Sequence, residues 1–227
     1  MTTVLLVRHG LTRMTGPVLA GWTPGIDLDE RGVAQAAAVA ERLYPVPLAA
    51  IVTSPLERCA QTAAAIGAGR DVTPIVDDRV GEARYGDWTG GELKKLSRDP
   101  LWRKVQVHPS AVTFPAGESL RATAARAVDA VRDWNGRLGE HATYAVVSHG
   151  DVIKAVVADA LGVHLDLFQR IQIDPCSVTV IRYTEVRPVL VRLNDIGSLG
   201  DLLPPKKKSR RKASSDAAVG GGGGAQL

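Results

Sequence analysis

The sequence predicts an α/β fold, a three-layer α/β/α sandwich in which a mostly parallel sheet lies between two layers of helices. Apolar runs rich in valine, isoleucine and leucine alternate with longer segments of helical periodicity, and this alternation is typical of such folds. Strands are expected over residues 3–8, 48–53, 143–148, 178–183 and 188–193, with a weaker candidate near 72–76, and helices over 29–43, 55–66, 117–138 and 151–161.

Local signals support several of these elements. Asp29 stands where it could cap the first helix, and Pro55 suits the first turn of the second. A short Thr-Glu connection joins the last two strands, which predicts an antiparallel hairpin at one end of the sheet. The stretch 77–115 has no regular pattern, so we expect it to cover one end of the sheet as a lid or a wall of the substrate site.

The chain has the length and composition of a globular protein. It contains 227 residues, of which 45% are hydrophobic, enough for a sizeable core. There is no apolar run of about 18 residues and no leader-like start, so we expect no contact with a membrane and a cytoplasmic location. Two cysteines, Cys59 and Cys176, are too few for a disulfide framework and lack neighbours at metal-ligand spacing.

The basic residues are concentrated at the end of the chain. The segment Lys206–Lys212 contains six of them, more than the net charge of +4 of the whole sequence, so the rest is close to neutral. From Pro204 the composition changes to lysine, arginine, serine and glycine. We therefore expect one domain over residues 1–203 and a basic, glycine-rich, disordered tail over residues 204–227.

Two predicted strands end in histidine followed by glycine. Arg8, His9 and Gly10 follow the first apolar run, and His149 and Gly150 follow the run 143–148. The carboxyl edge of a parallel sheet is the usual ligand crevice of an α/β fold. Gly10 would let the backbone turn or approach a ligand, and the helix that follows Gly150 offers free N–H groups to an anion.

Two further charged residues fit the same edge. Arg58 lies about one turn into the helix that follows Ser54 and Pro55, so its side chain could reach back over the sheet edge. Glu82 lies among glycines and aromatic residues and not on a charged helix face. An exposed helical arginine is the commoner structural role for a residue such as Arg58.

Two arginines, two histidines and one carboxylate form a coherent set for phosphoryl transfer. Arginine binds phosphate oxygens through paired N–H donors. A neutral imidazole can take up the phosphoryl group, and a second histidine, if protonated, would stabilise its oxygens. A glutamate whose pKa is raised by burial can protonate the departing alkoxide and later activate water. This chemistry predicts neither a metal nor a cofactor.

These motifs resemble those of the histidine phosphatase superfamily, the phosphoglycerate mutase-like proteins, over residues from about Thr3 to about Asn194. Ser-Pro-x-x-Arg followed by Gln-Thr-Ala and the segment Gly117-Glu118-Ser119 are also similar to that family, most closely to actinobacterial members of the phosphomutase type. The resemblance implies a phosphoglycerate mutase-like fold, a small phosphorylated substrate and a hydrolase of the histidine acid phosphatase type. It implies that His9 is the nucleophile, that Arg8, Arg58 and His149 form the phosphate pocket, and that Glu82 is the proton donor. Candidate substrate contacts are Gly10, Thr12, Thr15, Gly21, Arg84 and Gly150.

The same resemblance leaves a phosphoglycerate-type mutase as an alternative. Mutases of the family have an arginine after the acid and an asparagine six residues after the nucleophile, where this chain has Ala83 and Thr15. Both differences remove groups that would hold an anionic product, which favours hydrolysis. Arg84, Arg103, Lys94 and Lys95 could supply carboxylate contacts from shifted positions, and this keeps the mutase alternative open.

A different class of function would use the tail. In this alternative the domain is catalytically idle, and residues 206–212 bind nucleic acid or an anionic membrane non-specifically and in a salt-dependent way. The complete catalytic set argues against it. A homodimer is left open.

Cys176 and Arg182 match the Cys-x5-Arg spacing of cysteine-dependent phosphatases. The residues between them alternate as in a strand, and a straight strand cannot wrap a phosphate. We therefore expect a strand here and not a second phosphate site.

Overall fold

The computed structural model describes residues 1–197, which form a six-stranded sheet flanked by helices. The sheet order is β3-β2-β4-β1-β5-β6, with the first four strands parallel and β5 and β6 antiparallel to their inner neighbours. The predicted hairpin at the sheet end is thus confirmed. The strands are β1 (Thr2–Arg8), β2 (Ile51–Thr53), β3 (Ile75–Val76), β4 (Thr143–Ser148), β5 (Val178–Tyr183) and β6 (Pro188–Asp195).

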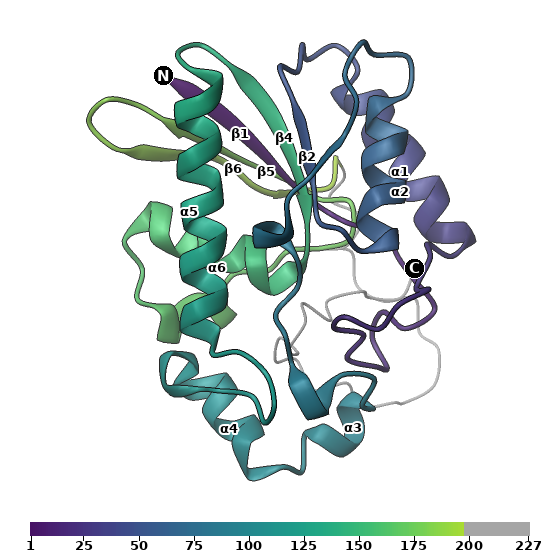
Figure 1. Cartoon of the computed structure of the whole chain (residues 1–227), viewed down its shortest axis with the longest axis vertical. Coiled ribbons are helices and arrows are strands. Elements are labelled where there is room, and N and C mark those ends of the chain that lie inside the picture. The colour runs from purple at the N-terminus through teal and green to yellow at the C-terminus, as the bar shows by residue number, and fades with distance from the viewer. Residues whose placement is uncertain (198–227) are drawn as a thin grey trace, which may run out of the picture.

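Helices cover both faces of the sheet, which confirms the predicted three layers. Figure 1 shows α5 (Leu120–Leu138) and α6 (Gly150–Leu161) on one side and α1 (Glu30–Leu43) and α2 (Glu57–Gly67) on the other. Side chains of β1 alternate between the layers: Leu5 and Val7 pack with the α1 and α2 side, and Val4 and Leu6 with the α5 and α6 side. The continuous apolar run of β1 is therefore explained by burial on both faces.

The turn after β1 packs closely against the start of α1. Asp29 caps α1 as predicted, because its carboxylate accepts a hydrogen bond of 2.9 Å from the backbone N–H of Gly32. A Cβ on Gly32 would overlap the carbonyl oxygen of Leu11, and a Cβ on Gly10 would lie 2.6 Å from the carbonyl oxygen of Gly32. Only glycines permit this approach, which fixes the path of the chain beyond β1.

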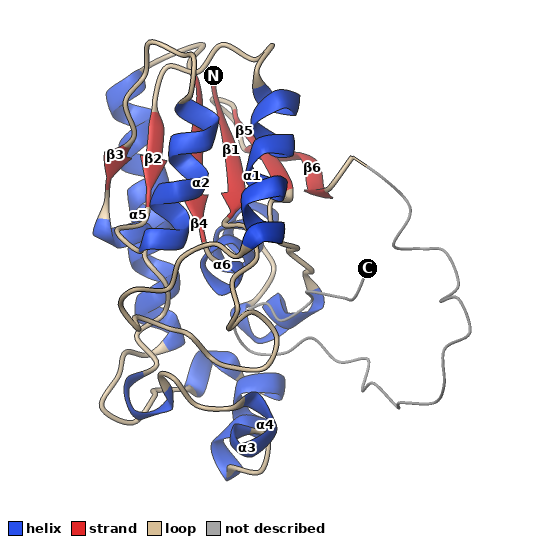
Figure 2. Cartoon of the chain, turned by 90° about the vertical axis from the view of Figure 1, so that its right-hand side faces the viewer, coloured by secondary structure: helices blue, strands red, loops and turns tan. Residues whose placement is uncertain are grey.

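The segment expected to be irregular lies at the carboxyl ends of the parallel strands (Figure 2). It contains two short helices, α3 (Leu93–Leu96) and α4 (Pro100–Val107), of which α4 has Asp99 as its cap and proline in its first turn. The remaining turns are 3-10 helices at Asp78–Val80, Gly86–Trp88 and Pro109–Ala111. The prediction of its place at one end of the sheet is confirmed, and the two short helices were not predicted.

Several predicted boundaries differ by a few residues. The helix expected from residue 55 begins at Glu57, because Pro55 precedes the cap residue Leu56 and the hydroxyl of Ser54 accepts the Leu56 N–H at 3.3 Å. The helix expected from residue 117 begins at Leu120, because Ser119 caps it. The strands expected over 48–53 and 72–76 are shorter than predicted.

The residues after Cys176 form β5, so the Cys-x5-Arg spacing lies along a strand as expected. Among residues 1–197, no helix is both long and apolar enough to cross a membrane. The predicted domain boundary at residue 203 and the predicted tail over 204–227 lie outside the described residues.

Candidate active site

The two histidines meet because β1 and β4 are parallel neighbours. Arg8 pairs with Ser148 in the register of the two strands, so His9 and His149 follow at the same edge. The His9 N–H donates to the carbonyl of Ser148 at 3.0 Å, and the two imidazole rings lie 5.1 Å apart at an angle of 61°. The sheet topology thus brings together residues 140 positions apart in sequence.

The hydrogen bonds of His9 define its tautomer. Nδ1 lies 2.7 Å from the carbonyl oxygen of Gly10, which only accepts, so Nδ1 carries the proton. Nε2 then has a lone pair, and Arg58 donates to it from Nε at 3.3 Å. Burial lowers the pKa of His9 well below its ordinary value, with Arg58 and Arg8 acting in the same direction. His9 is therefore a neutral imidazole whose nucleophilic nitrogen lines the pocket.

Arg58 is buried at the centre of the site, not exposed on its helix. Its side chain comes from the first turn of α2 and is only 1% exposed. One terminal nitrogen, Nη2, donates to the carbonyl of Gly21 at 2.8 Å and lies 3.3 Å from Nδ1 of His149. The other, Nη1, has no hydrogen-bond partner within residues 1–197. A buried guanidinium donor without a partner is suited to an anionic ligand.

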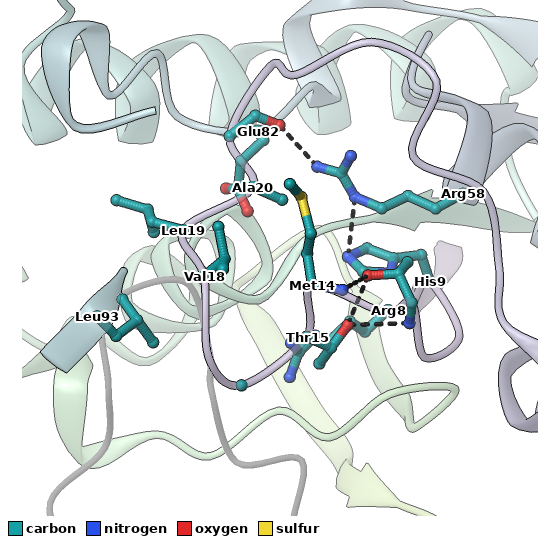
Figure 3. A pocket seen from close by; sticks show the side chains of 13 residues that line it. Arg8, His9, Met14, Thr15, Val18, Leu19, Ala20, Arg58, Glu82 and Leu93 are labelled. Atoms are coloured by element: carbon teal, nitrogen blue, oxygen red, sulfur yellow. Dashed lines mark hydrogen bonds between the residues drawn. The ribbon is translucent and has the colours of Figure 1, made fainter. Parts of the chain in front are cut away.

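Arg8 supplies a second buried guanidinium to the pocket. It lies at the end of β1, is 2% exposed, and donates from Nη1 to the carbonyl of Ile173 at 2.7 Å. Burial lowers the pKa of Arg8, but an arginine keeps its charge at neutral pH. Arg8, His9 and Arg58 therefore converge on one pocket, which Figure 3 shows with Glu82 on its opposite side.

His149 is held by Ser54 at the end of β2. Its Nε2 lies 2.8 Å from the Ser54 hydroxyl, and its Nδ1 lies 3.8 Å from a carboxylate oxygen of Glu82. Burial first, and then Arg58, lower the pKa of His149 well below its ordinary value. His149 is therefore neutral. The sequence analysis considered a protonated second histidine, and burial together with the neighbouring guanidinium disfavours that form.

Glu82 reaches the same pocket from the segment that follows β3. Its side chain is 5% exposed and accepts the N–H of Ala83 at 2.9 Å. Burial, followed by the charge of Asp151, raises the pKa of Glu82 to about 7. A carboxyl group that is partly protonated at neutral pH can donate a proton to a leaving group.

The backbone around Glu82 is held by Arg126 of α5. The guanidinium of Arg126 donates to the carbonyl of Glu82 at 2.8 Å and to the carbonyls of Arg79 and Gly81, each at 2.7 Å. It also pairs with Glu118 at 2.6 Å. We call Arg126 and Glu118 the clamp. The Gly-Glu-Ser segment pointed to Glu118 in the sequence, whereas the sequence analysis did not single out Arg126.

A buried polar network behind the pocket was also missed by the sequence analysis. The Tyr85 hydroxyl donates to Asp151 at 2.9 Å, and the Lys154 ammonium lies 3.6 Å from the same carboxylate and donates to Gln169 at 3.0 Å. Asp151 and Lys154 are each 1% exposed. The occurrence of charged residues in a largely apolar helix was the signal that could have identified them.

The predicted substrate contacts divide into two groups. Thr12, Thr15 and Gly21 line the pocket, and the hydroxyls of the two threonines lie 3.0 Å apart. Gly10, Gly150 and Arg84 are not among the lining residues. Arg84 is exposed and its guanidinium stacks on the Trp22 ring at 4.0 Å. The role of all six in binding a substrate stays a prediction.

The chain was compared with models of known protein families. Residues 4–196 match the histidine phosphatase superfamily, branch 1. The chain belongs to this superfamily. The prediction of the family is confirmed, whereas the narrower resemblance to actinobacterial members of the phosphomutase type stays a prediction.

Similar proteins in this superfamily include phosphatases. Phosphoserine phosphatase 1 of Hydrogenobacter thermophilus is 33% identical over 88% of this chain and 96% of its own length. The structure of Bacillus stearothermophilus YhfR is 30% identical, with a TM-score of 0.80 over 86% of this chain and 98% of that one. A phosphoserine phosphatase from Entamoeba histolytica, solved with phosphoserine, is 26% identical, with a TM-score of 0.78 over 88% of this chain and 100% of that one. These relatives support a phosphatase enzyme.

Proposed function

We propose that this chain is a phosphomonoesterase that hydrolyses small phosphorylated metabolites through a phosphohistidine on His9, without a metal ion, as a hydrolase of the histidine acid phosphatase type. One observation carries the proposal. The hydrogen bond of 2.7 Å from His9 Nδ1 to the Gly10 carbonyl leaves the lone pair of the ring on Nε2. The same pocket also contains two buried arginines. A neutral nucleophile beside fixed positive charge suits attack on a phosphate ester.

The first chemical step transfers the phosphoryl group to the enzyme. His9 Nε2 forms a bond to phosphorus while the bond from phosphorus to the ester oxygen breaks, and protonated Glu82 gives its proton to the departing oxygen. The second step reverses these roles. Water attacks the phosphohistidine, the Glu82 carboxylate takes a proton from it, and the bond from nitrogen to phosphorus breaks to release inorganic phosphate.

The arginines supply the charge that a metal ion supplies in other phosphatases. Arg8 and Arg58 are both nearly fully buried at the pocket, where their attraction for phosphate oxygens is little screened by water. The free Nη1 of Arg58, within the described residues, is a donor available to a bound phosphate. This charge supports the proposal of a reaction that needs no metal.

Hydrolysis is favoured over mutase activity by the residues near the acid and the nucleophile. Ala83 is fully buried and offers no charge, and Thr15 is engaged with Thr12. A mutase must hold its product until the phosphoryl group returns to it, whereas a site with fewer anion-binding groups releases the product and admits water. The mutase remains the second candidate, supported by the family relationship alone.

The test is phosphate release from p-nitrophenyl phosphate and from 3-phosphoglycerate in the presence of EDTA. Wild type should turn over p-nitrophenyl phosphate, His9→Ala should lose this activity, and His141→Ala should retain it because that histidine is exposed. Interconversion of 3- and 2-phosphoglycerate without phosphate release would favour the mutase. Inactivity in both assays would favour an idle domain, and loss of activity with EDTA would contradict metal independence.

A further inference from the structure

Both polar and apolar side chains line the pocket. The side chains of Arg8, His9, Arg58 and Glu82 are all assigned above to the phosphoryl group or its proton. The apolar residues come from the loop after β1 and from α3, and Figure 3 shows Val18, Leu19 and Leu93 across the pocket from His9 and Arg58, with Met14 between them. We call this the apolar wall, formed by Met14, Val18, Leu19, Ala20 and Leu93.

Backbone hydrogen bonds hold the apolar wall in place. The Leu19 N–H donates to the carbonyl of Gly91 at 2.9 Å, and the Leu19 carbonyl accepts from Gly90 at 2.8 Å. The Leu93 N–H donates to the carbonyl of Pro17 at 2.9 Å, next to a bridge between Val18 and Glu92. These hydrogen bonds join the loop after β1 to the segment that contains the start of α3, so the backbone that carries the apolar side chains is held in place.

Two cations near the pocket, Arg84 and Lys95, are engaged in other contacts. Arg84 lies on Trp22, and Lys95 pairs with Glu92 at 2.7 Å. Within residues 1–197, Arg8 and Arg58 are the cationic side chains that line the pocket. A carboxylate next to the phosphate would therefore lose its water against the apolar wall without gaining a partner, which is costly.

We infer that the pocket selects phosphate monoesters of uncharged, mainly apolar alcohols and discriminates against substrates that carry a carboxylate near the phosphate. The inference rests on the proposed hydrolase function and names its substrate class. Burial of each apolar carbon against the wall stabilises the bound ester, whereas the phosphoryl group provides the only negative charge that the site neutralises. Phosphoserine, the ligand of a similar enzyme, is the informative competitor.

The experiment compares kcat/KM for three-carbon esters that differ in their hydroxyl groups and then in a carboxylate. Propyl phosphate, glycerol 1-phosphate and 3-phosphoglycerate form such a series, and phosphoserine and p-nitrophenyl phosphate complete the set. We expect propyl phosphate to exceed 3-phosphoglycerate and phosphoserine by roughly tenfold or more, with glycerol 1-phosphate between them. Equal values, or a preference for the carboxylated esters, would overturn the inference and leave the hydrolase function standing. No turnover of any ester, p-nitrophenyl phosphate included, would overturn both.

Two variants test the wall directly. Leu93→Lys places a cation in it and should raise kcat/KM for 3-phosphoglycerate relative to propyl phosphate by roughly tenfold. Val18→Thr keeps the shape of the side chain and should lower kcat/KM for propyl phosphate by a few-fold, about the effect of a lost apolar contact. Val33→Thr, at an exposed position of α1, is the matched control and should change neither. An unchanged ratio in folded Leu93→Lys together with unchanged Val18→Thr would contradict the inference.

Discussion

Burial moves the proton affinities of His9 and Glu82 in opposite directions. It lowers the pKa of His9, because a charged imidazole would lie beside two arginines without water. It raises the pKa of Glu82 to about 7, with Asp151 adding to the effect. The nucleophile is therefore neutral and the acid partly protonated over the same range of pH, which is the combination that the first chemical step needs.

The pH dependence of turnover should reflect this pair. For an alkyl phosphate, kcat should fall as pH rises through about 7, because the proton that Glu82 donates is lost there. The low-pH limb should lie well below the ordinary pKa of histidine, because His9 stays neutral to lower pH. A pH profile of kcat measures both limbs, and a profile that rises through pH 7 would contradict the role of Glu82 as the acid.

Glu82→Gln removes the proton donor and keeps its shape. We expect the rate of phosphorylation by an alkyl phosphate to fall by about 10²- to 10⁴-fold, the usual contribution of a general acid. With p-nitrophenyl phosphate the loss should be much smaller, because nitrophenolate leaves without a proton. Single-turnover kinetics with both esters separate these effects. Equal losses would remove Glu82 from the acid role.

Among the secondary-structure elements, α5 acts at the site through the clamp. Arg126 binds three carbonyls around Glu82 and pairs with Glu118. The position of the acid therefore depends on a residue of α5, which is distant from Glu82 in the sequence. Arg126→Ala should lower kcat for alkyl phosphates by about 10²-fold, the cost of a small misplacement of a catalytic group, with little change in KM. The loss should be smaller for p-nitrophenyl phosphate, whose leaving group needs no proton. A general loss of structure would instead lower kcat for both esters equally.

Arg132→Ala provides the control for the clamp. Arg132 lies on the same helix, its side chain is 61% exposed, and it pairs with Asp159 away from the pocket. Its replacement should leave kcat unchanged for both esters. Arg126→Lys keeps the charge but not the forked donors and should recover only part of the activity. Full activity in Arg126→Ala would show that Glu82 is positioned without the clamp.

The close contact between α1 and the turn after β1 should make the stability of the protein sensitive to Gly32. Gly32→Ala would force its Cβ against the Leu11 carbonyl, so we expect the free energy of unfolding to fall by about 1–3 kcal/mol, as for other overpacked sites. Gly136→Ala in α5 has open space around the added methyl and should raise that free energy by about 0.5–1 kcal/mol. Urea unfolding measures both, and equal effects of the two substitutions would contradict the proposed close packing.

At the scale of the whole molecule, the sheet topology gathers residues from distant parts of the chain at one edge. Arg8, His9 and His149 could be predicted from the sequence, because each lies at the end of an apolar strand and strand ends of a parallel sheet share an edge. Glu82 was a candidate because it lies among glycines and aromatic residues. Its position in space could not be predicted, because the segment that contains it has no helical or strand periodicity.

Other parts of the site could not be predicted from local patterns. Arg126 occurs in a helix where a charged residue is ordinarily exposed, and only the packing of α5 turns it toward the site. The stacking of Arg84 on Trp22 depends on the path of two loops and likewise leaves no local signal. Two helices begin two to three residues later than predicted, because Pro55 lies before the cap residue of α2 and Ser119 caps α5.

The measurement that tests the account most directly is trapping of the phosphoenzyme. Wild type and His9→Ala are mixed with ³²P-labelled p-nitrophenyl phosphate in EDTA, quenched with denaturant during turnover, and assayed for protein-bound label. We predict a label that is stable to alkali, labile to acid and located on the peptide containing His9, and none on His9→Ala. Turnover by wild type without such a label, or a label on another residue, would contradict the phosphohistidine mechanism.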